Sequence, residues 1–111
     1  MNPDINKFLE DILISIDVIE FHLKEIKSIM EYSNNITVSD AVERRFGIIG
    51  EALWKANKIE PSISVTDKIK IINFRHLLIH EYDQIDDSTI YRIAKEKLSV
   101  LKEEIKKLLQ P

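Results

Sequence analysis

The chain has 111 residues, the length of one small domain, and it contains no cysteine, 2 glycines and 3 prolines. The lack of cysteine excludes a disulfide framework, a zinc site with thiolate ligands and a thiol nucleophile. The shortage of glycine and proline argues against a fold with many turns and strands. Hydrophobic residues at 44% and charged residues at 32% are typical of a folded globular protein.

The net charge of -3 is distributed unevenly. The balance is -6 over residues 1–43, +4 over 44–80 and -1 over 81–111. If the chain has a phosphate-binding surface, it is therefore expected in the middle third. The alternative is that the charge of helix faces varies by chance. The first four residues lack the basic and apolar regions of a signal peptide, and no apolar run is long enough to cross a membrane. We therefore expect a cytoplasmic protein.

The apolar spacing predicts four helices, and the first is expected from Asp4, as the N-cap, to about Glu31. Its apolar residues alternate steps of four and three, a repeat typical of a helix that packs along another long helix. They are Ile5, Leu9, Ile12, Ile16, Ile19, Leu23, Ile26 and Met30.

The second helix is expected from about Thr37, where residues 37–40 fit a capping box, to a point before Pro61. It contains Gly47 and Gly50, and glycine inside a helix suggests close approach to a neighbouring backbone. Its apolar face is Val38, Val42, Phe46, Ile49, Leu53 and Ala56.

The third helix is expected from Ser64 or Thr66 along a face of Val65, Ile69, Ile72, His76 and Ile79, and it is expected to fade within residues 82–87. The last is expected from Asp87 or Ser88 to about Leu109. Its core face is Ile90, Ala94, Leu98, Leu101, Ile105 and Leu108. Short connections favour antiparallel neighbours. The sequence therefore predicts an all-α, up-and-down four-helix bundle that forms a single domain over residues 1–111.

The densest cluster of reactive side chains lies in residues 73–82 and contains Arg75, His76, His80 and Tyr82. His76 and His80 are four residues apart, so they share a helix face and could bind one metal ion, although no third ligand is obvious. Arg75 and His80 are about 140° apart around an ideal helix. They would converge if the helix ended near His80 or if a second subunit supplied one of them.

Structural roles are open for the same residues. Arg75 could pair with Glu51 or with an acid on the last helix, and His80 could be a half-buried histidine. Tyr82 could anchor a helix end. His22 is expected on the surface. For Trp54, the core or a subunit interface is favoured over a base-stacking platform.

Residues 75–82, Arg-His-Leu-Leu-Ile-His-Glu-Tyr, resemble the R-x-x-x-x-H-x-Y motif of HepT-like toxins in the HEPN superfamily. Residues 46–53 are similar to the second-helix segment of that family, and the resemblance in length and helix order covers the whole chain. One difference is His76, because HepT-like sequences more often have asparagine at that position.

The resemblance implies a metal-independent ribonuclease, without a cofactor, that is the toxin of a toxin–antitoxin pair. It implies a homodimer in which Arg75 and His80 of both subunits line one cleft, with His76 as a supporting residue. The expected partner is a nucleotidyltransferase antitoxin of the MNT type, which attaches AMP to Tyr82. The RNA products would be a 2′,3′-cyclic phosphate and a 5′-hydroxyl.

The side-chain chemistry is compatible with this reaction, because RNA carries its own nucleophile, the 2′-hydroxyl. A histidine can transfer protons near neutral pH, and an arginine can bind a phosphate through two parallel hydrogen bonds. A second hypothesis from another class is a non-catalytic helical module that binds a nucleotide or a protein partner. Toxicity that is lost on substitution of His80 would distinguish the two.

Overall fold

The computed structural model describes residues 2–110, which form six α-helices and one 3-10 turn, with no strand among them. The all-helical prediction is therefore confirmed. The elements are α1 (Pro3–Leu23), α2 (Ile29–Asn34), α3 (Ile36–Ile59), α4 (Lys68–His80), the 3-10 turn η1 (Tyr82–Gln84), α5 (Asp87–Glu96) and α6 (Leu98–Leu109). No helix within this range is long and apolar enough for a membrane crossing.

Helix α1 carries the predicted seam, but it is shorter than expected. The side chain of Asn2, and not Asp4, caps it by accepting a hydrogen bond from the Asp4 N–H at 2.7 Å. The predicted end near Glu31 is wrong, because α1 ends at Leu23 and Ser28 caps a separate helix α2. The repeat from Ile5 to Ile26 is nevertheless buried, whereas Met30 is 71% exposed.

Helix α3 begins one residue before the expected start. Asn35 is its N-cap and accepts a hydrogen bond from the Val38 N–H at 3.0 Å, so the capping box at residues 37–40 is not used. The helix ends at Ile59, before Pro61, as predicted. The predicted core face is buried from Val42 to Ala56, and Val38 is half-buried.

The last predicted helix is two helices. Asp86 caps α5 by accepting a hydrogen bond from the Ser88 N–H, and the chain bends at Lys97 before α6 begins. Both helices keep the predicted stripe turned to the core, where Ile90, Ala94, Leu98, Leu101 and Ile105 are buried. The periodicity therefore predicts the buried face correctly but not the break.

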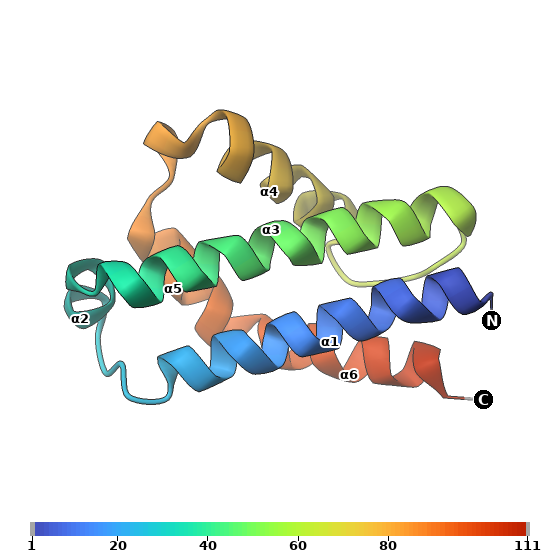
Figure 1. Cartoon of the computed structure of the whole chain (residues 1–111), viewed down its shortest axis with the longest axis horizontal. Helices are drawn as coiled ribbons and strands as arrows, with labels where there is room; N and C mark the ends of the chain where they lie inside the picture. Colours follow the sequence, from blue (N-terminus) through green and yellow to red (C-terminus); the bar gives the residue numbers. More distant parts are fainter. Residues whose placement is uncertain (1, 111) are drawn as a thin grey trace.

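The four long helices follow one another in the order α4, α3, α1, α6, and successive elements run in opposite directions (Figure 1). Helix α1 packs against α3 and α6, and α4 packs against α3. The connection before α4 is tied to α6, because the Glu104 carboxylate accepts hydrogen bonds from the N–H and hydroxyl of Thr66. Helix α4 thus lies at one edge of the molecule.

The face predicted for the third helix is wrong at three of its five positions, since Val65 is buried just before α4 and Ile72 packs partly against the core. Ile69 and Ile79 are 59% and 53% exposed, and His76 is exposed too. The side chains that pack toward the core are Ile71, Phe74 and Leu78, together with the partly exposed Ile72. No residue of α4 is fully buried. The reason is that α4 has isoleucine and leucine on both sides, so periodicity does not select one of them.

Candidate functional site

The backbone of α4 lies very close to α3 at Gly50. A Cβ atom added there would lie 2.7 Å from the Cβ of Arg75 and 3.0 Å from the carbonyl oxygen of Ile71. The predicted close approach at a glycine is therefore confirmed for Gly50. At Gly47 it is wrong, because an added Cβ would meet no atom within 4 Å. The contact at Gly50 places Arg75 directly on the surface of α3.

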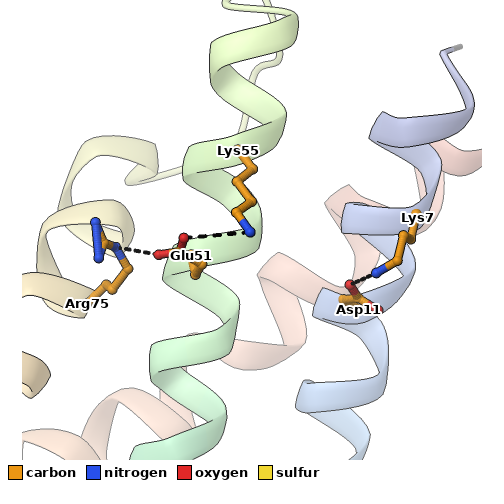
Figure 2. A network of polar contacts seen from close by, with 5 residues as sticks. All are labelled: Lys7, Asp11, Glu51, Lys55 and Arg75. Atoms are coloured by element: carbon orange, nitrogen blue, oxygen red, sulfur yellow. Dashed lines mark hydrogen bonds and ion pairs between the residues drawn. The ribbon is translucent and has the colours of Figure 1, made fainter.

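The side chain of Arg75 is directed toward Glu51 of α3 (Figure 2). Its Nε lies 3.0 Å from Oε2 of Glu51, and the other oxygen of that carboxylate lies 3.8 Å from Nζ of Lys55. The guanidinium carbon of Arg75 also lies 5.2 Å from the centre of the Trp54 ring, a distance suited to a cation–π contact. The expected alternative of pairing with Glu51 is confirmed as a contact.

Arg75 can bind an acceptor other than Glu51, because its side chain is neither fully buried nor fully hydrogen-bonded. Its Nε is buried and close to Glu51, but the N–H does not point well at the carboxylate and has no hydrogen-bond partner within residues 2–110. About a quarter of the side chain, 26%, remains exposed. A buried donor without a well-directed acceptor favours exchange of partners when a better acceptor, such as a phosphate oxygen, is present.

Arg75 lines a groove of about 610 Å³ between α1, α3 and α4. Apolar side chains form part of its wall, including Phe8 and Leu78. The charged side chains are four cationic and three acidic ones, namely Lys7, Arg44, Lys55, Arg75, Asp11, Glu43 and Glu51. The groove therefore combines an apolar wall with a slight excess of positive charge, which is compatible with a base and its phosphate.

Glu43, on the wall of the groove, has acidic neighbours. Burial raises the pKa of the Glu43 carboxyl, and the negative charges of Asp87 and Asp40 raise it further. Burial, followed by Glu43 and Asp87, also raises the pKa of the Tyr32 hydroxyl. The Tyr32 ring is fully buried, and its hydroxyl has no hydrogen-bond partner within the described part of the chain. An anionic ligand is therefore disfavoured beside Glu43.

His76 and His80 form a pair on the outward side of α4. Their ring centroids are 4.7 Å apart, the ring planes are tilted by 44°, and both residues are exposed. Helix α4 ends at His80. Even so, neither histidine lines the groove that contains Arg75. The structure of a single chain brings the histidines together but does not bring either of them to Arg75. Across residues 2–110, no three acidic or histidine side chains converge as metal ligands.

Tyr82 differs sharply from the other two tyrosines in accessibility. It lies in η1, directly after α4, and is 74% exposed. Tyr32 is buried, and Tyr91 is half-buried with its ring centroid 5.5 Å from that of Tyr32. Among the three tyrosines, Tyr82 is thus the one whose ring a second protein can readily reach.

Two neighbours of Arg75 were not assigned to the site from the sequence. Trp54 is half-buried and contacts both Arg75 and Lys58, with the Lys58 ammonium 4.4 Å from its ring centre. Glu51 and Trp54 follow Gly50 by one and four residues. The glycine, which predicted a close helix contact, is therefore the sequence feature that could have pointed to them.

His22 was expected on the surface. It is half-buried and packs edge-on against Phe21.

The helical fold and the R-x-x-x-x-H-x-Y spacing from Arg75 to Tyr82 agree with the expected HEPN-type protein. A family model described as "Ribonuclease HepT-like" matches residues 12–108, and the chain belongs to this HepT-like family.

Relatives from Methanocaldococcus jannaschii agree with this assignment. The chain is 36% identical over 104 residues to a protein named "Putative RNase MJ1380", with 92% of this chain and 94% of the relative covered. It is 33% identical over an alignment of 113 residues to "Putative RNase MJ0125", with 96% and 92% covered. It is 30% identical to "Gamma-glutamylcyclotransferase and putative RNase MJ0434", where 99% of this chain matches 50% of the longer relative. No solved structure gave a significant match.

Proposed function

We propose that this chain is a metal-independent endoribonuclease that acts in the cytoplasm as the toxin of a HEPN/MNT toxin–antitoxin pair. Its catalytic residues are Arg75 and His80, His76 supports them, and residues 1–111 form one HEPN-like bundle domain. Membership of the HepT-like family and the names of the relatives support the reaction class. The position of Arg75 on the wall of the groove supports its role as the phosphate ligand.

The single observation that carries the proposed assembly is the unpartnered apolar side of α4. Ile69 and Ile79 are more than half exposed, and Leu77 is exposed beside the histidine pair. A helix that is apolar on both sides is usually covered on both. A second copy of the chain that packs against this side would bury the isoleucines. It would also bring His80 of one copy toward Arg75 of the other.

The proposed reaction is an in-line transesterification of RNA. His80 accepts the proton of the 2′-hydroxyl while the 2′-oxygen bonds to the adjacent phosphorus, and the bond from phosphorus to the 5′-oxygen breaks. The histidine of the second copy donates a proton to that 5′-oxygen. The products are a 2′,3′-cyclic phosphate and a 5′-hydroxyl. Arg75 binds the phosphoryl oxygens as negative charge develops on them.

Control of the toxin is proposed to act through Tyr82. Its exposure makes the hydroxyl accessible to a nucleotidyltransferase antitoxin, whereas Tyr32 is buried. AMP on Tyr82 adds a bulky phosphodiester anion at the end of the motif helix, where it competes with RNA phosphate for Arg75 and blocks the cleft. Intact-mass measurement after co-expression with the antitoxin should find added AMP on a peptide that contains Tyr82. AMP on Tyr91 instead would contradict the assignment.

The catalytic proposal is tested by replacing His80 with alanine, with His22→Ala as the matched control. Each removes one imidazole, but His22 lies on α1, outside the motif helix. Cleavage of a single-stranded RNA should fall about 10²–10⁴-fold in His80→Ala and stay near wild type in His22→Ala. A chimera with one 2′-deoxy position should resist cleavage at that position, and EDTA should not slow the wild type. Cleavage by His80→Ala at the wild-type rate would refute the assignment.

A non-catalytic module remains the competing function, because Arg75 is already paired with Glu51. That function predicts RNA or nucleotide binding without cleavage at any concentration. It also predicts expression without toxicity for the wild type and for His80→Ala alike. The same cleavage and toxicity assays therefore decide between the two functions.

A further inference from the structure

We propose that His76 and His80 form a two-histidine binding site for a divalent transition-metal ion such as Zn²⁺, and that the bound ion switches the ribonuclease off. The proposed reaction uses no metal, so this site is inhibitory and not part of the chemistry. The binding half of the proposal stands on the geometry of α4. The inhibition half rests on the proposed function of His80.

The spacing of the two rings fits one shared ion. Imidazoles that bind an ion through nitrogens at about 2.0–2.1 Å have ring centroids about 4.5–5.2 Å apart, for angles at the metal of about 90–109°. The centroids of His76 and His80 are 4.7 Å apart. The two residues lie one turn apart on the continuous helix α4. The separation of the two rings therefore allows both to bind one ion without a change in the backbone.

Exposure and local charge favour a cation at this place. Both histidines are exposed in the single chain, and in the proposed dimer they line the cleft that admits RNA, so an ion can reach them with its remaining positions hydrated. His80 is the last residue of α4, where the unpaired carbonyls of the helix end carry partial negative charge. The next acids along the chain are Glu81 and Asp83. A cation is thus stabilised here even though only two side chains bind it.

The donor type determines which ions bind. Two imidazoles suit Zn²⁺, Cu²⁺ and Ni²⁺, whereas Mg²⁺ prefers oxygen ligands. A metal ion occupies the nitrogen lone pair of a neutral histidine, which is the same lone pair that accepts a proton in general-base catalysis. His80 therefore cannot accept a proton through a nitrogen that is bound to the ion. His76 supplies the second ligand, so that the two histidines bind the ion together. The proposed reaction does not need His76 for proton transfer.

Binding is measured directly on the full chain, independently of nuclease activity. The chain has 3 histidines, so their ring proton resonances can be resolved by NMR during titration with Zn²⁺. The resonances of His76 and His80 should shift together and those of His22 should not. His76→Asn and His80→Asn should each weaken Zn²⁺ binding by about 10-fold or more, because one of two ligands is lost. The matched control His22→Asn should bind as the wild type does.

Two results would overturn the site. One is that Zn²⁺ at millimolar concentration leaves the ring resonances of His76 and His80 unmoved, and the other is that His76→Asn binds Zn²⁺ as tightly as the wild type. Both substitutions are at exposed positions on α4, and circular dichroism verifies that each variant is folded. Mg²⁺ at the same concentration is the negative control.

Inhibition is measured as the ratio of the cleavage rates without and with Zn²⁺, taken within each variant so that any change in basal rate cancels. The ratio should be about 10 or more for the wild type and for His22→Asn, and close to 1 for His76→Asn. Equal ratios for the wild type and His76→Asn would refute inhibition through this pair, as would activation by Zn²⁺. If the wild type does not cleave RNA, the proposed function and the inhibition fail, and the NMR titration still decides the binding site.

Discussion

Replacing Gly50 with alanine should push α4 away from α3. The new methyl group would lie 2.7 Å from Cβ of Arg75 and 3.0 Å from the backbone oxygen of Ile71. Neither atom is at the free end of a flexible side chain, so the helices themselves must separate. Overpacking of this kind costs about 1–3 kcal/mol, while the better helix propensity of alanine returns up to about 1 kcal/mol. We expect a net loss of about 1 kcal/mol in the free energy of unfolding.

Gly47→Ala is the matched control, because it is the same substitution one turn earlier on α3. An alanine Cβ there would have no atom within 4 Å, so propensity alone acts and stability should rise by up to about 1 kcal/mol. The two variants should therefore differ by about 1–3 kcal/mol, with opposite signs relative to the wild type. Urea unfolding followed by circular dichroism measures this difference.

Fluorescence adds a local measurement, since the chain has 1 tryptophan and Trp54 lies against Arg75. The emission of native Gly50→Ala should differ from that of the wild type, because displacement of α4 moves the guanidinium away from the ring. Native Gly47→Ala should keep the wild-type spectrum. If Gly50→Ala is stabilised as much as Gly47→Ala and leaves the emission unchanged, α4 does not lie on α3 at this point.

Two further predictions concern Tyr32 and Glu43, whose pKa values are raised by burial and by nearby acids. Burial raises the pKa of Tyr32, so the folded state retains a proton that the unfolded state releases, and stability should fall as the pH rises above the ordinary value of 10.0. Tyr32→Phe should lack that loss and, because the hydroxyl is unpaired, be at least as stable as the wild type at pH 8; equal slopes in alkaline unfolding curves would contradict this. The raised pKa of Glu43 predicts that Glu43→Gln is more stable than the wild type at pH 7. The difference should vanish below the ordinary value of 4.5, where the carboxyl is protonated in both states, and thermal melts across this range measure it.

The sequence predicts the core of α1, α3, α5 and α6 because each has one continuous apolar stripe, whereas the exposed apolar residues, such as Ile14 and Phe21 of α1, form no second stripe of this kind. It does not predict the break after Leu23, since Ile26 and Met30 continue the same repeat and only the cap at Ser28 marks a new helix. The bend at Lys97 is missed for the same reason, because the stripe from Ile90 to Ile105 continues through it. A stripe records which side is buried, not whether the helix is continuous.

The motif positions were predictable because Arg75, His80 and Tyr82 are set by spacing along the chain. Their surroundings were not, because these depend on contacts between helices. The pairing of Arg75 with Glu51 was one of several options, and the stacking on Trp54 was not foreseen. The sequence alone does not predict whether the α3 surface beside Gly50 packs against α4 or against α1.

The orientation of α4 about its own axis explains both the wrongly predicted face and the contacts of Arg75. The predicted core face, centred on Ile72 and His76, and the observed one, centred on Ile71 and Arg75, differ by one residue, which is a rotation of about 100°. With the predicted face inward, the histidine of that face would be desolvated against the core, and Arg75 would leave its partner Glu51. With the observed face inward, Arg75 meets the one place on α3 where the missing side chain of Gly50 lets the helices touch. The same rotation leaves His76, His80 and the apolar residues Ile69 and Ile79 exposed together. Apolar residues lie on both sides of α4, and this is why the apolar spacing does not predict its core face. The same property gives the helix a second apolar surface that is available for a partner.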